Sequence, residues 1–191
     1  MKRNLSKKYR AVFLDRDGVV VKEPPHYAHR IDQLRLVAGS AQAIRQLNFR
    51  DFLVIVISNQ AGVARGYFKE EDTKRFNDEM VRRLKKQGAK IDAVYYCPHH
   101  PEGTVTQYRI ACDCRKPAPG MIKTAAKELG INLRKSFIVG DKWSDIDAGK
   151  NAGCKGYLVR TGQGKEQSNK RSGEVAIAGN LGEAVKLIIS K

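Results

Sequence analysis

Phe13-Leu14-Asp15-Arg16-Asp17-Gly18 joins the end of an apolar run to two carboxylates and a glycine. Side chains two residues apart in an extended chain point to the same side. Asp15 and Asp17 are therefore expected to face one crevice from a strand end, while Gly18 lets the backbone turn away. Neighbouring carboxylates repel each other unless a cation or proton lies between them, so the pair predicts a Mg²⁺ site. The alternative for the same residues is an ordinary solvated turn.

Around this segment, short apolar runs alternate with helical patterns along the chain, which is typical of parallel β-α-β units. The expected strands are Ala11–Leu14, Phe52–Ile57, Ala93–Tyr96, Phe137–Val139 and Gly156–Val159. The expected helices lie at roughly 40–48, 71–87, 118–129, 145–152 and 181–190. The segment from Thr161 to Gly173 is rich in Gly, Ser and Lys and predicts a mobile loop. The pattern predicts an α/β fold with a parallel sheet and one domain over residues 1–191.

Polar residues follow three of the expected strands. Asp15 and Asp17 follow the first, Ser58-Asn59-Gln60 the second and Gly140-Asp141 the fourth. Ligands of open α/β sheets bind at the carboxyl ends of the strands. These side chains are therefore expected to converge on one crevice.

The composition limits the classes of protein that the chain can represent. Its longest apolar run, from Phe52 to Ile57, is far too short to cross a membrane. The basic start is followed by only four apolar residues before Asp15, so no signal peptide is predicted and a cytoplasmic location is expected.

The formal charge of +16 is spread along the chain. We interpret it mainly as solvated surface charge, and secondly as a means of attracting an anionic substrate.

Three of the four cysteines lie close together in the sequence. With one histidine they supply three thiolates and an imidazole, a common tetrahedral zinc set: Cys97, His99, Cys112 and Cys114. Four protein ligands leave no open position, so such a zinc would be structural and would hold a loop at about 97–114. His100 is a less favoured ligand than His99. Four unrelated residues in a loop are the alternative, and Cys154 is interpreted as a small buried apolar residue.

The same residues suggest a phosphoryl-transfer site. Asp15 is the candidate nucleophile, and Asp17 is the candidate general acid and base. Asp141 supplies a third carboxylate for Mg²⁺. Ser58 offers a hydroxyl and Lys116 a positive charge, with Lys116 expected at the first turn of a helix because Pro117 follows it. Taken singly, a capping serine and a surface lysine are the alternatives.

The order D-x-D-G, S-N-Q, R-K-P and G-D-x-x-x-D resembles the haloacid dehalogenase superfamily of phosphohydrolases, from Val12 to about Thr161. The resemblance implies an aspartyl-phosphate mechanism and a three-layer Rossmann-like fold. It also implies that Mg²⁺ is held by Asp15, the backbone carbonyl of Asp17, and Asp141. Asp145 would then support these ligands or serve as an acid in the first turn of a helix.

Further runs are similar to the heptose-bisphosphate phosphatases of the histidinol-phosphate phosphatase-like branch, namely Cys97–Pro101, Cys112–Pro117 and Asn59–Gly66. That branch lacks a large cap domain, and only 42 residues lie between Asp15 and Ser58. The resemblance implies a monomeric enzyme that removes the 7-phosphate of a small phosphorylated sugar, a heptose 1,7-bisphosphate. The pathway implied makes lipopolysaccharide precursors.

The resemblance also implies a set of substrate-binding residues. They are Arg16, Glu23, Pro24, Pro25, His26, Ser58, Asn59, Gln60, Ala61, Arg115, Lys116 and Lys142. Arg115 would recognise the second phosphate, since a guanidinium group suits its geometry. The run from Glu23 to Tyr27 is a residue longer than the usual turn, which leaves the preferred anomer open.

Three alternatives remain. Histidinol phosphate would use the same site, although Arg115 and the basic composition favour a substrate with two anionic groups. A nucleic-acid 3′-end phosphatase would be expected to show clustered basic residues with aromatic platforms, and the sequence has no such pattern. A non-catalytic, zinc-stabilised nucleic-acid-binding module would not need the three aspartates, the serine and the lysine together.

Overall fold

The computed structural model of the chain describes residues 8–23, 27–171, 173 and 175–190. Within these residues, six parallel strands form one sheet in the order β3-β2-β1-β4-β5-β6. The strands are β1 (Ala11–Asp15), β2 (Leu53–Asn59), β3 (Ala93–Cys97), β4 (Phe137–Gly140), β5 (Lys155–Val159) and β6 (Ala176–Ala178). The predicted parallel α/β sheet is confirmed.

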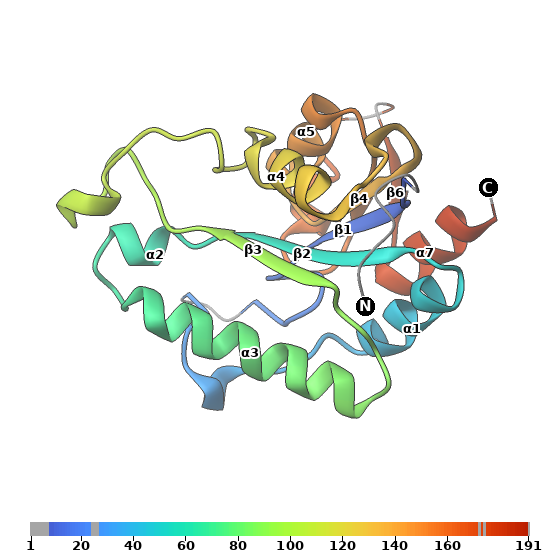
Figure 1. Cartoon of the computed structure of the whole chain (residues 1–191), viewed down its shortest axis with the longest axis horizontal. Coiled ribbons are helices and arrows are strands. Elements are labelled where there is room, and N and C mark those ends of the chain that lie inside the picture. Colours follow the sequence, from blue (N-terminus) through green and yellow to red (C-terminus); the bar gives the residue numbers. More distant parts are fainter. Residues whose placement is uncertain (1–7, 24–26, 172, 174, 191) are drawn as a thin grey trace.

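Helices cover both faces of the sheet and give the three layers that the family resemblance implied. They are α1 (Ser40–Phe49), α2 (Ala61–Ala64), α3 (Glu70–Lys86), α4 (Gly120–Leu129), α5 (Trp143–Ala152), α6 (Gly164–Gln167) and α7 (Leu181–Ile189). Figure 1 shows α4 and α5 on one face, and α1, α3 and α7 on the other. The described part of the chain contains no inserted cap domain between β1 and β2.

The central strands are apolar throughout because both of their faces are covered. Val12 and Leu14 lie in the core that includes α1, α3 and α7. Ala11 and Phe13 point the opposite way, into the core beneath α4 and α5. All four side chains are fully buried. This burial on both faces explains why β1 appears in the sequence as a continuous apolar run.

Three short elements were missed in the sequence, namely β6, α2 and α6. The strand β6 has only three residues, too few for a recognisable pattern, and it is ordered by pairing with β5. The predicted loop from Thr161 to Gly173 contains α6. The indole Nε1 of Trp143, the first residue of α5, donates a hydrogen bond to the carbonyl of Gln167 at 2.8 Å. This contact fastens the segment to α5.

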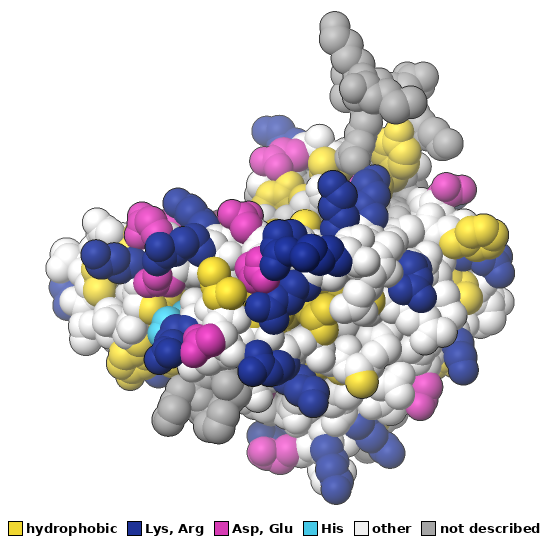
Figure 2. Space-filling view, turned by 90° about the horizontal axis from the view of Figure 1, so that it is seen from below, with side chains coloured by type: hydrophobic (Ala, Val, Ile, Leu, Met, Phe, Trp, Pro, Cys, Tyr) yellow, Lys and Arg dark blue, Asp and Glu magenta, His cyan; other side chains and the backbone are white. Residues whose placement is uncertain are grey.

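The surface charge is dispersed, as the sequence predicted. Figure 2 shows Lys and Arg side chains spread over the face that carries α3, with acidic side chains among them. Along α3, Glu79 pairs with both Arg82 and Arg83, and Asp72 pairs with Arg75. Within the described residues, no helix is both long and apolar enough to cross a membrane.

Candidate active site

The carboxyl ends of β1, β2 and β4 meet at a cavity of about 650 Å³. Asp15 ends β1, and Asp141 directly follows β4. Ser58 and Asn59 were expected after the second strand, but they are its last two residues because β2 stays paired with β3 as far as Cys97. The polar groups therefore converge as the sequence predicted, from slightly different positions on their strands.

A buried ammonium group connects these strand ends. The Nζ of Lys116 lies 2.6 Å from Asp15 Oδ1 and 2.6 Å from Asp145 Oδ1. Burial lowers the pKa of Lys116, but the carboxylates of Asp145 and Asp15 outweigh burial and hold this pKa above its usual value. Lys116 is therefore a permanent positive charge at the candidate nucleophile.

Lys116 is not held by a helix terminus, which corrects the expectation from Pro117. The helix α4 begins only at Gly120, since the backbone first closes a turn in which Gly120 N–H donates to the carbonyl of Asp113 at 2.8 Å. The side chain of Asn59 holds the backbone of Lys116 instead. It accepts a hydrogen bond from the Lys116 N–H and donates one to the Lys116 carbonyl, both at 3.0 Å.

Three carboxylates form a candidate cation site. Asp15, Asp141 and Asp145 each offer an oxygen, and these oxygens lie within 4.8 Å of one another. Asp141 is fully buried, and its Oδ2 accepts a hydrogen bond from Gln163 N–H at 2.8 Å. Its Oδ1 has no hydrogen-bond partner in the described structure. A Cβ at Gly18 would lie 2.2 Å from Asp141 Oδ2, so only glycine fits beside this carboxylate. A buried oxygen without a donor, beside further carboxylates, fits Mg²⁺.

The electrostatics of this trio also favour a cation. Burial raises the pKa of Asp15 to about 7, and the neighbouring Asp145 adds to the shift, although Lys116 acts in the opposite direction. Burial, followed by the charges of Asp15 and Asp145, raises the pKa of Asp141 to about 8. Both pKa values lie close to neutral pH, so protons and a cation would compete for these carboxyls.

The second aspartate of the motif is held by an arginine from the interior. Arg16 is fully buried, and its Nε donates to Asp17 Oδ1 at 3.1 Å. Its other nitrogens donate to the carbonyl of Ala28 at 2.8 Å and to Asn77 Oδ1 at 3.0 Å. The guanidinium group therefore orients Asp17, and the contact of Arg16 with substrate stays a prediction. The side chain of Asp17 keeps 17% of its surface exposed.

The side chain of Gln60 also has an orienting position, and its contact with substrate stays a prediction. It is 1% exposed, and its Nε2 donates to Ser58 Oγ at 2.7 Å and to Asp17 Oδ2 at 3.1 Å. Ala61, the next predicted contact, is 5% exposed in α2. Because Ser58 Oγ accepts from Gln60, its own O–H remains available to donate into the cavity that it lines.

Another predicted substrate group lies on the loop after β1. Glu23 Oε1 is 3.0 Å from Lys142 Nζ and accepts a hydrogen bond from Gln163 Nε2 at 3.1 Å. All three side chains line the cavity. Pro24, Pro25 and His26 lie outside the described residues, so their predicted contacts are not located.

A cluster of cationic side chains adjoins the cavity, and the sequence identified only part of it. Arg65 lines the cavity, and its Nη2 lies 3.5 Å from His100 Nε2. Partial burial and the charges of Arg115 and Arg65 lower the pKa of His100. Arg115 does not line the cavity but points along the loop, where it donates to the carbonyl of His99 at 3.4 Å. Within the described structure, neither Arg65 nor Arg115 forms an ion pair with a carboxylate.

Aromatic side chains form a further part of the lining, and the sequence indicated only the run that ends in Tyr27. They are Tyr27, His29, Tyr67 and Phe68. Two come from the loop after β1 and two from the segment after α2. Because about 40 residues separate the two pairs in the sequence, their contact could not be predicted from it.

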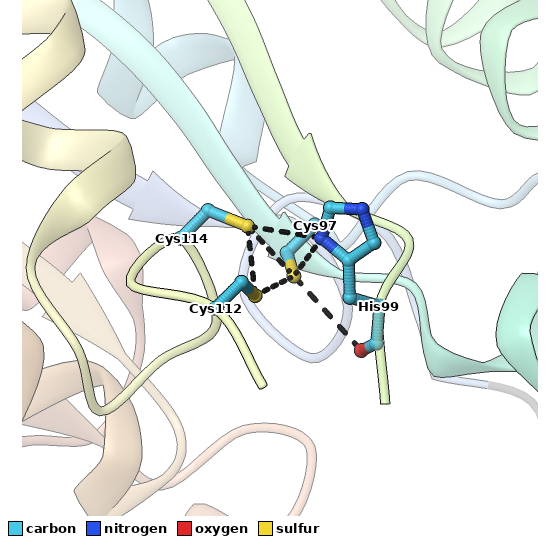
Figure 3. Close-up of side chains that lie close together, drawn as sticks. All are labelled: Cys97, His99, Cys112 and Cys114. Atoms are coloured by element: carbon cyan, nitrogen blue, oxygen red, sulfur yellow. Dashed lines mark hydrogen bonds between the residues drawn. The ribbon is translucent and has the colours of Figure 1, made fainter. Parts of the chain in front are cut away.

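The predicted metal cluster of cysteine and histidine is assembled in the structure (Figure 3). The three Sγ atoms lie 3.0 to 3.5 Å apart, and His99 Nδ1 is 3.4 Å from Cys114 Sγ. Burial is the main cause that raises the pKa of Cys97 and of Cys114. His100 is not part of the cluster. Three thiols and one imidazole in contact fit a tetrahedral, sulfur-preferring metal.

Replacing Lys116 with Met tests the importance of the buried ammonium group. We expect metal-free Lys116→Met to lose about 3 kcal/mol of unfolding free energy at pH 8, because two buried carboxylates are left without their partner. Urea unfolding measures this loss, with Lys123→Met, an exposed lysine on α4, as the matched control. Equal stability of the two variants would contradict the role of Lys116.

The raised carboxyl pKa values predict an unusual dependence of stability on pH. Because Asp15 and Asp141 bind protons more tightly when folded, metal-free stability should fall as the pH rises from about 4, the usual carboxyl pKa, to about 8. We expect a lower melting temperature at pH 8.5 than at pH 6, and Asp141→Asn should reduce this difference. Asp78→Asn, an exposed acid on α3, should preserve it. A wild-type melting temperature that is higher at pH 8.5 would contradict the prediction.

Comparison with known sequences places the chain among phosphatases. A family model described as HAD-hydrolase-like matches residues 113–184. A D-glycero-beta-D-manno-heptose-1,7-bisphosphate 7-phosphatase from Rhodopseudomonas palustris is 48% identical over 77% of this chain and 81% of its own length. The enzyme of the same name from Escherichia coli K12 is 41% identical over 83% of each chain.

Solved structures show the same fold. The D,D-heptose 1,7-bisphosphate phosphatase from B. bronchiseptica, in complex with magnesium and phosphate, superposes with a TM-score of 0.85 at 32% identity, over 95% of this chain and 98% of that one. The corresponding enzyme from Burkholderia thailandensis gives a TM-score of 0.72 at 27% identity, over 95% and 99%. The chain therefore belongs to the haloacid dehalogenase-like hydrolases, in the family of the heptose-bisphosphate phosphatases.

Proposed function

We propose that the chain is a Mg²⁺-dependent phosphatase that removes the 7-phosphate of D-glycero-D-manno-heptose 1,7-bisphosphate. The observation that carries this proposal is the contact of Lys116 with Asp15 beside a cavity that Asp17 and Ser58 also line. A nucleophile, an acid/base group and donors for phosphoryl oxygens are thereby brought together. The names of the relatives support the choice of substrate.

The reaction proceeds in two displacements. A carboxylate oxygen of Asp15 attacks phosphorus and the P–O ester bond breaks, which leaves an aspartyl-phosphate. Asp17 gives its proton to the departing sugar oxygen. It then takes a proton from water, whose oxygen attacks phosphorus, and cleavage of the acyl-phosphate bond frees phosphate and restores Asp15. Asp17 is suited to this exchange because its side chain is partly exposed and is held by hydrogen bonds from Arg16 and Gln60.

Ser58 would donate a hydrogen bond to a phosphoryl oxygen, because it lines the cavity next to Asp15. Lys116 would contribute its positive charge there, since its three N–H donors already contact Asp15, Asp145 and the carbonyl of Ile57. When bound by Asp15, Asp141 and the backbone carbonyl of Asp17, Mg²⁺ supplies positive charge that offsets repulsion between the phosphate and the carboxylates. The orphaned Oδ1 of Asp141 supports this assignment.

A second anionic group on the substrate accounts for the cationic cluster. Arg65 and Arg115 flank His100 without carboxylate partners in the described chain. Guanidinium groups bind phosphate oxygens in a fork geometry. We therefore assign these residues to the phosphate that is not removed. A cytoplasmic location, a monomeric state and a place in lipopolysaccharide-precursor synthesis stay predictions from the sequence.

We assign a structural Zn²⁺ to Cys97, His99, Cys112 and Cys114. The four donor atoms leave no position for substrate, so the metal would hold the loop after β3 rather than take part in the reaction. Cys114 is two residues from Lys116, which makes the cluster an anchor for the segment that delivers the ammonium group.

The zinc assignment is tested by metal content. We expect about one zinc per wild-type chain, measured by mass spectrometry after purification without chelator. Cys112→Ser should lose the metal and make the loop susceptible to protease, since metal binding and local folding are coupled. Cys154→Ser, a buried thiol outside the cluster, should keep the zinc. Equal zinc in the two variants would refute the assignment.

The proposed reaction is tested with Asp15→Asn. This variant should fold normally, yet release no phosphate from heptose 1,7-bisphosphate in Mg²⁺, because a neutral amide is a poor nucleophile. Asp78→Asn should behave as wild type. A screen of both heptose anomers, histidinol phosphate and a 3′-phosphorylated DNA end, measured as kcat/KM, identifies the substrate. Activity retained by Asp15→Asn would exclude the aspartyl-phosphate mechanism.

A further inference from the structure

Four aromatic side chains meet at the cavity and form a continuous surface, here called the aromatic wall: Tyr27, His29, Tyr67 and Phe68. The ring centroids of Tyr27 and Tyr67 are 5.5 Å apart, and those of Tyr27 and Phe68 are 6.0 Å apart. His29 stacks on Phe68 at 4.6 Å with an angle of 4° between the planes. None of the roles assigned to the reaction uses these residues.

The base of the wall is fixed by close packing. Phe68 is 8% exposed, and its ring lies so close to Gly62 that a Cβ there would be 2.2 Å from it. His29 Nδ1 contacts the carbonyl of Tyr27 at 2.8 Å within the loop after β1, and the rings of both residues pack on Phe68. A rigid surface loses little conformational entropy when a ligand covers it.

Tyr67 forms the open edge of this wall. Its side chain is 61% exposed although it lines the cavity, and no hydrogen bond to its hydroxyl is found within the described residues. An aromatic ring left open to water gains free energy when an apolar surface covers it. The face of such a ring is also negative, so it attracts weakly positive C–H groups.

We infer that Tyr67 and Tyr27 stack against the C–H face of the substrate's sugar ring and that Tyr67 is a specificity-determining residue. The inference rests on the proposed function, which supplies a ring with C–H groups on its faces. Polar groups for the sugar hydroxyls line the same cavity, in Glu23, Lys142 and Gln163. A sugar therefore matches the cavity in two ways, because its C–H face fits the aromatic wall and its hydroxyls fit the polar groups.

The test compares a substrate that has the sugar ring with one that has none. For Tyr67→Ala, we expect kcat/KM for heptose 1,7-bisphosphate to fall about tenfold more than kcat/KM for glycerol 3-phosphate, mainly through KM. Tyr67→Phe keeps the ring and should stay within about twofold of wild type on the sugar. Phe49→Ala removes an 86% exposed ring on α1, away from the cavity, and is the matched control.

Two results would overturn the inference and leave the proposed function standing. One is an equal loss by Tyr67→Ala on both substrates, and the other is a loss by Tyr67→Phe as large as that of Tyr67→Ala. A wild-type enzyme that cleaves histidinol phosphate but not the heptose bisphosphate would overturn the proposed function, and this inference with it.

Discussion

The contact of the Lys116 ammonium with Asp15 and Asp145 is the constraint on which the site depends. Lys116 and Asp15 are 101 residues apart in sequence, so their contact joins the end of β1 to the segment that precedes α4. Asp145 adds the first turn of α5. Charges are stable in such a buried position only when they are paired and hydrogen-bonded. These contacts therefore hold the candidate catalytic groups together in the folded chain.

The same contact leaves the site short of positive charge. Two of the three buried carboxylates contact the Lys116 ammonium. Burial, together with repulsion among the three carboxylates, raises the pKa values of Asp15 and Asp141 to about 7 and about 8. A divalent cation would remove this conflict by taking the place of the protons on the carboxyls. The fold thus holds an unfavourable electrostatic arrangement of buried carboxyls, which is common at active sites.

The two candidate metal centres differ in their donor atoms and in their position relative to Lys116. The oxygen cluster lies inside the sheet's carboxyl edge, where a hard cation can meet the substrate. The sulfur cluster lies in the loop after β3, with Cys114 only two residues from Lys116. That loop lacks an extensive core of its own, so a metal there would fix the backbone that carries the ammonium group. Asn59 holds the same backbone from β2.

The sequence by itself determined the parallel sheet, the order of its first five strands along the chain, the carboxylate motif and the four donors of the sulfur cluster. These features follow from local periodicity and from residue types with few other uses. Only the tertiary structure decided that Arg16 and Gln60 orient Asp17 and that Arg65 and Tyr67 line the cavity. The physical reason is that an arginine, a glutamine or a tyrosine suits many environments, and its role is set by neighbours that folding brings from distant segments. The short β6 was likewise determined by its pairing with β5 and by no pattern of its own.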